Sequence, residues 1–192
     1  MFAVTERLLL RPGWVDDAPA LAAAIKHRDV AMKLARLPWP YSEDDARDFL
    51  AAPRGASDAD FLMFARTKGE PRLVGGIGLS ERDGDMEIGY WLSPSYWGLG
   101  FATEAGRAVV QIARHTLRLP RLVSGHFVDN PASGRVLRKL GFRPTGEIVR
   151  RHSVARGHEV PCVLYALELG EDDDSIDMPT DGNFTIREKM AA

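Results

Sequence analysis

The stretch of residues 96–104, Tyr-Trp-Gly-Leu-Gly-Phe-Ala-Thr-Glu, has the composition of a phosphate-binding loop that leads into a helix. Gly98 and Gly100 carry no Cβ, so successive main-chain N–H groups around them can point into one concavity. The helix-favouring residues that follow add unpaired N–H donors and the positive end of a helix dipole. Because a strand at 86–92 precedes the loop, the order of strand, loop and helix predicts a site for a phosphate or diphosphate.

The spacing of the glycines limits which phosphate ligand this loop could bind. No lysine follows the loop, whereas a nucleoside-triphosphate loop needs one for the terminal phosphates. Thr103 stands where the dinucleotide motif has its third glycine, and no acidic residue ends a strand about 20 residues further on. From these residues alone, a tight turn that requires small side chains explains the glycines equally well.

The same stretch resembles the diphosphate loop of the GNAT acetyltransferases, whose pattern is Gln/Arg-x-x-Gly-x-Gly/Ala. Trp97, Gly100 and Ala102 occupy its fixed positions, and Trp97 departs from the usual Gln or Arg. The full stretch matches the Tyr-Trp-Gly-x-Gly-Tyr/Phe-Ala-Thr-Glu-Ala form of the ribosomal-protein N-terminal acetyltransferases of the RimJ/RimL type. Three more stretches resemble that branch, in the family's order: 5–12, 87–92 and 130–142. The resemblance therefore extends from residue 5 to about residue 169.

The composition is that of one soluble globular domain. The chain has 192 residues, of which 45% are hydrophobic and 27% charged, with a net charge of −2 that gives no reason to expect nucleic-acid binding. We predict a single domain at 1–170 and an acidic tail at 171–192, whose run of like charges is typical of disorder. No signal peptide is visible and no apolar run reaches the ~20 residues that a membrane span requires, so a cytoplasmic location without membrane contact is expected.

Apolar runs and turn residues predict an α/β (α+β) fold with a mixed, mostly antiparallel sheet flanked by helices. The strands at 86–92 and 122–128, fourth and fifth of the predicted sheet, are joined by a helix, which implies that they pair in parallel. The resemblance implies that these two strands splay apart. The other predicted strands lie at 7–11, 61–66, 72–79, 145–153 and 159–169, and Ser42 is expected to cap a helix through Asp45.

The resemblance implies acetyl-CoA as co-substrate, with no metal. Its pantetheine arm would enter the gap between the splayed strands and pair with main-chain groups, and its diphosphate would lie on the loop. Asn130 would donate a side-chain hydrogen bond to the arm, although an Asn before Pro131 could equally satisfy local backbone. The predicted cofactor-binding residues are Trp91, Leu92, Ser93, Leu99, Gly100, Phe101, Ala102, Thr103 and Asn130.

Acetyl transfer to an amine requires that the amine lose a proton, because an alkyl ammonium is mostly protonated at neutral pH. The resemblance makes Glu87, on the strand beside the thioester, the first candidate for the base. The alternative interpretation of Glu87 is an ordinary glutamate on the surface of a strand, without a catalytic role. Glu159 is the second candidate and a water chain the third, while His126 and His152 are lone histidines for which a structural role is the simpler reading.

Ser133 is the candidate acid for the departing thiolate. Many acetyltransferases place a tyrosine seven residues after the Asn of this helix, but here that position is Leu137, and Ser133 matches a serine of the branch resembled. From the sequence alone Ser133 also reads as an ordinary first-turn residue. Cys162, the one cysteine, lies in an apolar run without a nearby base pattern, which favours a buried hydrophobe over a covalent intermediate.

The sequence thus predicts an acetyl-CoA-dependent N-acetyltransferase in which a primary amine attacks the thioester directly in a ternary complex. The acceptor is a small molecule or a peptide N-terminus, which the motifs do not decide because they cover the cofactor half. A CoA-binding sensor without turnover is the alternative from another class, and nucleotide binding by the glycine loop ranks below both. A homodimer is common in the family resembled.

Overall fold

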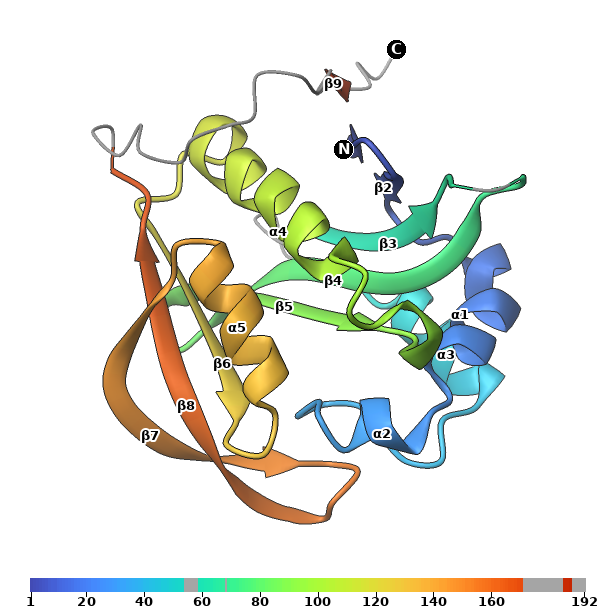
Figure 1. The fold of residues 1–192 in the computed structure, drawn as a ribbon. Coiled ribbons are helices and arrows are strands. Elements are labelled where there is room, and N and C mark those ends of the chain that lie inside the picture. Colours follow the sequence, from blue (N-terminus) through green and yellow to red (C-terminus); the bar gives the residue numbers. More distant parts are fainter. Residues whose placement is uncertain (54–58, 68, 171–184, 188–192) are drawn as a thin grey trace.

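The structure, a computed structural model, describes residues 1–53, 59–67, 69–170 and 185–187 (Figure 1). Its strands form one nine-stranded sheet in the order β7-β8-β6-β5-β4-β3-β2-β1-β9. Nine strands in a row form eight neighbouring pairs, and every pair except β5–β6 is antiparallel. The strands are β1 (Phe2–Val4), β2 (Leu8–Arg11), β3 (Ala59–Ala65), β4 (Arg72–Arg82), β5 (Asp85–Leu92), β6 (Arg121–Phe127), β7 (Arg143–Ser153), β8 (His158–Glu168) and β9 (Thr185–Arg187).

The predicted mixed sheet with a parallel pair of central strands is confirmed. β5 and β6 are joined through α4 (Phe101–Gln111) and pair in parallel at Glu87 and Val123. The helical connection produces this arrangement, because strands that run in the same direction need a crossover between them. Beyond the paired position the two strands diverge, and this divergence positions the site described below.

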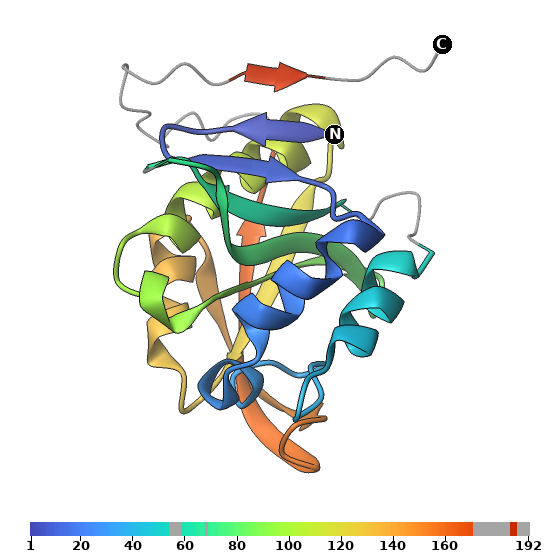
Figure 2. The same cartoon turned by 90° about the vertical axis from the view of Figure 1, so that its right-hand side faces the viewer.

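Helices cover both faces of the sheet (Figures 1 and 2). On one face α4 and α5 (Pro131–Lys139) pack on the larger apolar core, which includes Met63, Ile88 and Leu137. On the other face α1 (Ala18–Ile25) and α3 (Glu43–Ala51) cover a smaller cluster with Leu62 and Phe64. Neighbouring residues of β3 thus belong to different cores, as the alternation of side chains along a strand requires.

The predicted start of α3 is confirmed in detail. Ser42 Oγ accepts a hydrogen bond from Asp45 N–H at 3.1 Å, and the Asp45 carboxylate accepts one from Ser42 N–H at 2.7 Å. This reciprocal pair satisfies two of the helix's unpaired donors. The helix that follows the glycine loop continues from α4 through a π-helical turn at Ile112–Thr116.

Three short elements were not predicted from the sequence: β1, β9 and the single turn α2 (Arg28–Ala31). Each is too short for a periodic pattern, and both short strands depend on pairing with distant chain, β9 lying antiparallel to β1 (Figure 2). The tail predicted at 171–192 lies outside the described residues except for β9. Among the described residues, no helix is long and apolar enough to span a membrane.

Candidate active site

The gap between β5 and β6 is the structural centre of the site. In the part of the chain that the structure describes, the single pairing between these strands joins Glu87 with Val123. One residue further along each strand, Ser124 Oγ–H donates to the Ile88 carbonyl oxygen at 2.9 Å. This side-chain hydrogen bond takes the place of a ladder bond at the point of divergence. A cavity of about 730 Å³ runs along the opening and is lined by residues of both strands.

The orientation of the β5 main chain decides which groups face this opening. The Ile88 carbonyl points to β6, so by alternation the main-chain groups of Tyr90 and Leu92 face the same side. The Trp91 carbonyl is turned to β4, because a Cβ built on Gly75 would lie 2.3 Å from it. Ser93 N–H also points to β4 and donates to the Val74 carbonyl at 2.9 Å. Of the residues predicted to contact the cofactor through main chain at 91–93, Leu92 therefore faces the gap, together with Tyr90, whereas the Trp91 carbonyl and the Ser93 N–H face β4.

The glycine loop ends in a helix start with free main-chain donors. Gly98 and Gly100 adopt φ values of 77° and 84°, in the left-handed region that favours glycine. The first intrahelical bond runs from Glu104 N–H to the Gly100 carbonyl at 3.0 Å. The N–H groups of residues 101–103 therefore precede the helical ladder and form, with the helix dipole, a site for an anion.

Trp97 fastens this loop to the end of β5. Its indole N–H donates to the Leu92 carbonyl at 2.8 Å, and Lys33 Nζ lies 3.9 Å from the centroid of its ring. The tryptophan that replaces the family's usual Gln or Arg is thus a structural bridge that also places a lysine beside the loop. The Leu92 carbonyl already accepts this hydrogen bond from Trp97. The Leu92 N–H is therefore the main-chain group of this residue that can bind a ligand in the gap.

The N-terminal segment holds the loop from its other side. Arg7 Nη1 donates to the Leu99 carbonyl at 3.0 Å, and the guanidinium lies 4.7 Å from the Phe101 ring centroid. The Glu104 carboxylate accepts from Arg7 Nε at 2.7 Å, from Arg7 N–H at 2.8 Å and from Thr5 Oγ1 at 2.6 Å. The two sequence motifs at 5–12 and 96–104 therefore form one contact unit, in which Arg7 balances the charge of a glutamate close to the anion site.

Ser133, the predicted acid, lies beside a tyrosine that the sequence analysis did not single out. Tyr90 Oη is 2.8 Å from Ser133 Oγ and 3.1 Å from the Ser133 carbonyl oxygen. Burial raises the pKa of Tyr90 to about 12, although its hydrogen bond with Ser133 acts in the opposite direction. The phenol therefore stays protonated across the range in which enzymes work and keeps a donor beside Ser133. Asn130, at the start of α5, makes no side-chain capping bond and lines the cavity.

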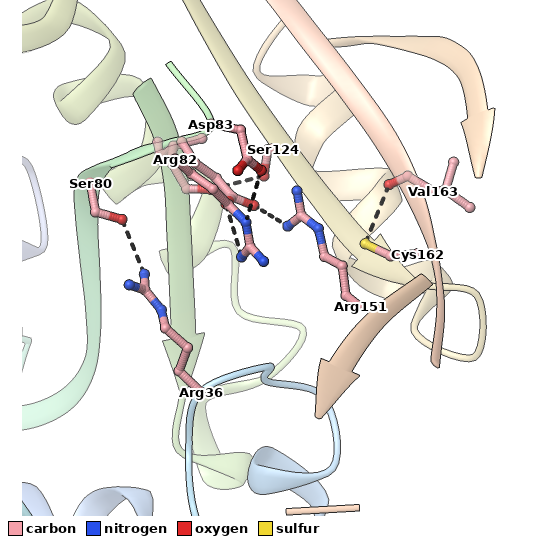
Figure 3. A network of polar contacts seen from close by, with 10 residues as sticks. Arg36, Ser80, Arg82, Asp83, Ser124, Arg151, Cys162 and Val163 are labelled. Carbon is pink, nitrogen blue, oxygen red and sulfur yellow. Dashed lines mark hydrogen bonds and ion pairs between the residues drawn. The ribbon is translucent and has the colours of Figure 1, made fainter. Parts of the chain in front are cut away.

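Glu87 lines the cavity, and each oxygen of its carboxylate contacts one guanidinium, that of Arg82 or that of Arg151 (both arginines are labelled in Figure 3). Arg82 Nη1 is 3.4 Å from Oε2, and Arg151 Nη1 contacts Oε1. The side chain of Glu87 is 12% exposed, so this carboxylate is not the surface strand residue that the sequence left open as the alternative. Its ion pairs hold it in a fixed orientation, and each oxygen keeps further accepting capacity for a ligand.

With this geometry established, comparison with known proteins identifies the family. A family model described as an acetyltransferase (GNAT) domain matches residues 7–143. The chain belongs to the GNAT acetyltransferase family. A relative in Bacillus subtilis, the uncharacterized N-acetyltransferase YnaD, is 28% identical over 148 residues, which are 76% of this chain and 85% of that protein. This GNAT protein is thus an N-acetyltransferase like its relatives.

Other matches agree with the RimJ/RimL branch. The ribosomal-protein-serine acetyltransferase of Escherichia coli is 32% identical over 117 residues, 55% of this chain and 63% of that protein. The B. subtilis N-acetyltransferase YoaA is 35% identical over 98 residues, so the match spans 55% of its length. A GNAT acetyltransferase structure from Bacillus anthracis superposes with a TM-score of 0.75 at 27% identity, covering 88% of this chain and 99% of that one. RimL in complex with coenzyme A shares the fold, with a TM-score of 0.72 at 21% identity and coverages of 85% and 94%.

Of the remaining candidate residues, some line the cavity and others lie outside it. Glu159 and His152 are exposed neighbours on the β7–β8 hairpin, outside the set of described residues that line the cavity. His126 is buried on the cavity wall, with Nδ1 2.8 Å from the Phe127 carbonyl oxygen. Cys162 is buried as predicted, and burial raises the pKa of its thiol. Among the described residues, no three His, Cys, Asp or Glu side chains gather as a metal site would require.

Proposed function

We propose that this N-acetyltransferase moves the acetyl group of acetyl-CoA to a primary amine by direct attack in a ternary complex. The observation that carries the proposal is the opening between β5 and β6, which leads from the free helix donors at 101–103 to the Glu87 carboxylate in one cavity. A ligand with a diphosphate at one end and a thioester at the other fits this sequence of groups.

The coenzyme would be held mainly by main chain. The N–H groups from Leu99 to Thr103 would bind the diphosphate, with the dipole of α4 and Lys33 adding favourable charge. The pantetheine arm would pair with the main-chain groups of Tyr90 and Leu92 that face the gap, and Asn130 would bind it from α5. The Leu92 or Tyr90 N–H is the donor we assign to the thioester carbonyl, whose oxygen gains charge when the amine attacks.

Glu87 is the base that we propose for the incoming amine. The carboxylate lines the cavity on the strand that would flank the thioester, and its two arginine partners leave it lone pairs for an ammonium or a water. An ammonium acceptor first loses one proton to solvent through Glu87, which leaves a neutral amine. As the amine nitrogen bonds to the thioester carbon, it becomes positively charged and passes a second proton to Glu87, directly or through one water. The carbon–sulfur bond breaks when the tetrahedral intermediate collapses.

Ser133 is the donor that we propose for the departing sulfur. Its hydroxyl can donate to the thiolate while it accepts a hydrogen bond from Tyr90, whose phenol stays protonated because its pKa is about 12. The proton that the amine released replaces the one given to the sulfur, so the cycle ends with neutral coenzyme A thiol and the amide. No covalent enzyme intermediate is needed, which agrees with a raised pKa that leaves Cys162 a protonated, poorly nucleophilic thiol.

The test is the release of free coenzyme A from acetyl-CoA in the presence of amines, followed with a thiol reagent. The panel combines amino acids, polyamines, amino sugars and N-terminal peptides, and mass spectrometry checks that each product has gained one acetyl group. We expect amine-dependent release with at least one acceptor class. Binding of coenzyme A without release for any amine would contradict the proposal and support a coenzyme-binding sensor instead.

A further inference from the structure

Three arginines from separate segments line the same cavity, and Figure 3 shows their side chains. Arg36 comes from the connection between α2 and α3, Arg82 ends β4, and Arg151 lies on β7. Arg82 and Arg151 contact the two oxygens of Glu87, and Arg36 Nη2 donates to Ser80 Oγ at 3.0 Å. We define these three side chains as the arginine cluster.

The arginine cluster has more guanidinium groups than inner carboxylates among its described ion pairs. Glu87 is the inner carboxylate in those pairs, and Asp45, Asp48 and Asp60 also line the cavity. Asp83 is 3.7 Å from Arg82 Nε, but its side chain is 94% exposed, so solvent screens its contribution. Among the contacts that the structure describes, Arg36 has a neutral serine as its side-chain partner. A cavity wall with this excess of guanidinium donors is suited to a ligand anion.

The coenzyme diphosphate is not the anion that this cluster would meet. Glu87 and Leu92 are five residues apart on one strand, which corresponds to about 17 Å in extended chain, and the glycine loop follows Leu92. The cluster lies on the Glu87 side of this distance. An anion there would belong to the second substrate, the amine.

We propose that the acceptor is an amine that carries a carboxylate or a phosphate close to its nitrogen, and that Arg36 binds this anion. The inference rests on the proposed function and names its substrate class. A planar guanidinium binds carboxylate or phosphate oxygens through two parallel hydrogen bonds, and Arg36 has donors beyond the one given to Ser80. With the anion on Arg36, an amine one or two carbons away reaches Glu87, since Ser80 is paired directly opposite Glu87 in the β4–β5 ladder.

The same charges act against other acceptors. A polyamine would bring two or more ammonium groups next to three guanidinium groups, and like charges at close range are unfavourable. The guanidinium groups also favour the neutral form of an approaching amine over its ammonium form, which is the form that can attack a thioester. The arginine cluster would therefore select the acceptor and assist its activation.

The test compares each anionic acceptor with its neutral counterpart, with rates expressed per concentration of unprotonated amine: L-alanine against L-alaninamide for the carboxylate, and O-phosphoethanolamine against ethanolamine for the phosphate, with spermidine as the polycation. For at least one pair we expect kcat/KM for the anionic member to exceed that for its neutral partner by at least about tenfold. The pair that shows the preference identifies which anion is recognised. In Arg36→Gln we expect this ratio to fall at least about fivefold, because the anionic member loses its guanidinium partner.

Arg28→Gln is the matched control, because Arg28 is an exposed arginine on the neighbouring α2 that does not line the cavity. It should leave the ratio unchanged. Equal or better turnover of the neutral amines or of spermidine would overturn the substrate class while leaving the acetyltransferase itself intact. An unchanged ratio in Arg36→Gln would overturn the role of Arg36. Failure of every amine, in these pairs and in the wider panel, would overturn this inference together with the proposed function.

Discussion

The two halves of the cavity differ in the groups that they present: main-chain donors in one half and charged side chains in the other. The half that we propose for the coenzyme, called the coenzyme half, consists of main-chain donors at 101–103, two glycines with positive φ and the unpaired edge of β5, all within one continuous stretch of chain. The half that we propose for the amine, called the acceptor half, consists of charged side chains, of which Arg36, Glu87 and Arg151 come from three distant segments. A main-chain site is fixed by fold and tolerates many side chains, whereas the acceptor half depends on individual side chains and can change its substrate by single substitutions.

Substitutions in the two halves should change different kinetic constants. Substitutions in the coenzyme half should raise KM for acetyl-CoA, because they weaken binding of the coenzyme. Damage to the acceptor half should lower kcat or kcat/KM for the amine and leave coenzyme binding intact.

Glu87→Gln should have the largest effect. Loss of a general base typically costs 10² to 10⁴ in rate, so we expect kcat to fall about a hundredfold or more, with KM for acetyl-CoA little changed. Steady-state kinetics with a saturating acceptor measures both constants. Glu159→Gln tests the rival base on the exposed hairpin and should keep normal kcat; the reverse pattern would transfer the role to Glu159.

Gly100→Val should weaken coenzyme binding by about tenfold. Gly100 has a φ of 84° at the start of α4, where a branched side chain costs about 1–2 kcal/mol of backbone strain. Gly84→Val is matched to it, since Gly84 has a φ of 87° in the β4–β5 turn with open space around its Cα. The control should lose similar stability but keep KM for acetyl-CoA. Equal KM values in both variants would mean that the loop does not bind the coenzyme.

Arg7→Ala should raise KM for acetyl-CoA about fivefold, in line with the loss of a hydrogen bond of about 1 kcal/mol that supports the loop at Leu99. We expect kcat to stay within about twofold of the wild type, because Arg7 touches the loop and not the reacting atoms. Arg11→Ala removes an arginine of the same N-terminal segment that pairs with Asp17 instead. A drop in kcat with unchanged KM in Arg7→Ala would contradict its positioning role.

Asp17→Asn should produce the smallest effect, on stability. Hydrogen bonds from Arg11 lower the pKa of Asp17 below its ordinary value of 3.8, so the folded state favours the charged carboxylate. That stabilisation is present above pH 4 and is lost as the pH falls through the lowered pKa. We expect Asp17→Asn to reduce the free energy of unfolding by about 1 kcal/mol at pH 7, and the difference from wild type to shrink below pH 4. Urea unfolding at both pH values measures this, and a constant difference would contradict the assigned cause.

The sequence predicted the local structure of the proposed coenzyme half well, because the signals for a glycine loop, a helix start and a crossover are local. Small residues and a helix start placed the loop at 96–104, and one crossover helix implied the parallel pairing of β5 with β6. The sequence could not show that the Trp91 carbonyl and Ser93 N–H face β4, since main-chain direction depends on the exact register of the ladder. Nor could it show the contact of Arg7 with Glu104, which joins residues 97 positions apart.

The acceptor half was largely beyond sequence reasoning. Glu87 was named through a family resemblance, but its two arginine partners come from different strands, and Arg151 is 64 positions away. Tyr90 and Ser133 lie 43 positions apart in the sequence. They meet because α5 packs on the face of the sheet that carries the Tyr90 side chain. Tyr90 was visible only as one aromatic residue in an apolar strand. Side-chain pairs of this kind leave no periodic pattern, so tertiary structure is needed to find them.

The most direct test of the account is a crystal structure of this protein with coenzyme A. The account predicts that the diphosphate oxygens accept hydrogen bonds from main-chain N–H groups between Leu99 and Thr103, and that the arm runs between β5 and β6 with its thiol directed to the cavity that holds Glu87. A diphosphate bound elsewhere, or an arm that leaves the gap between the strands empty, would contradict it.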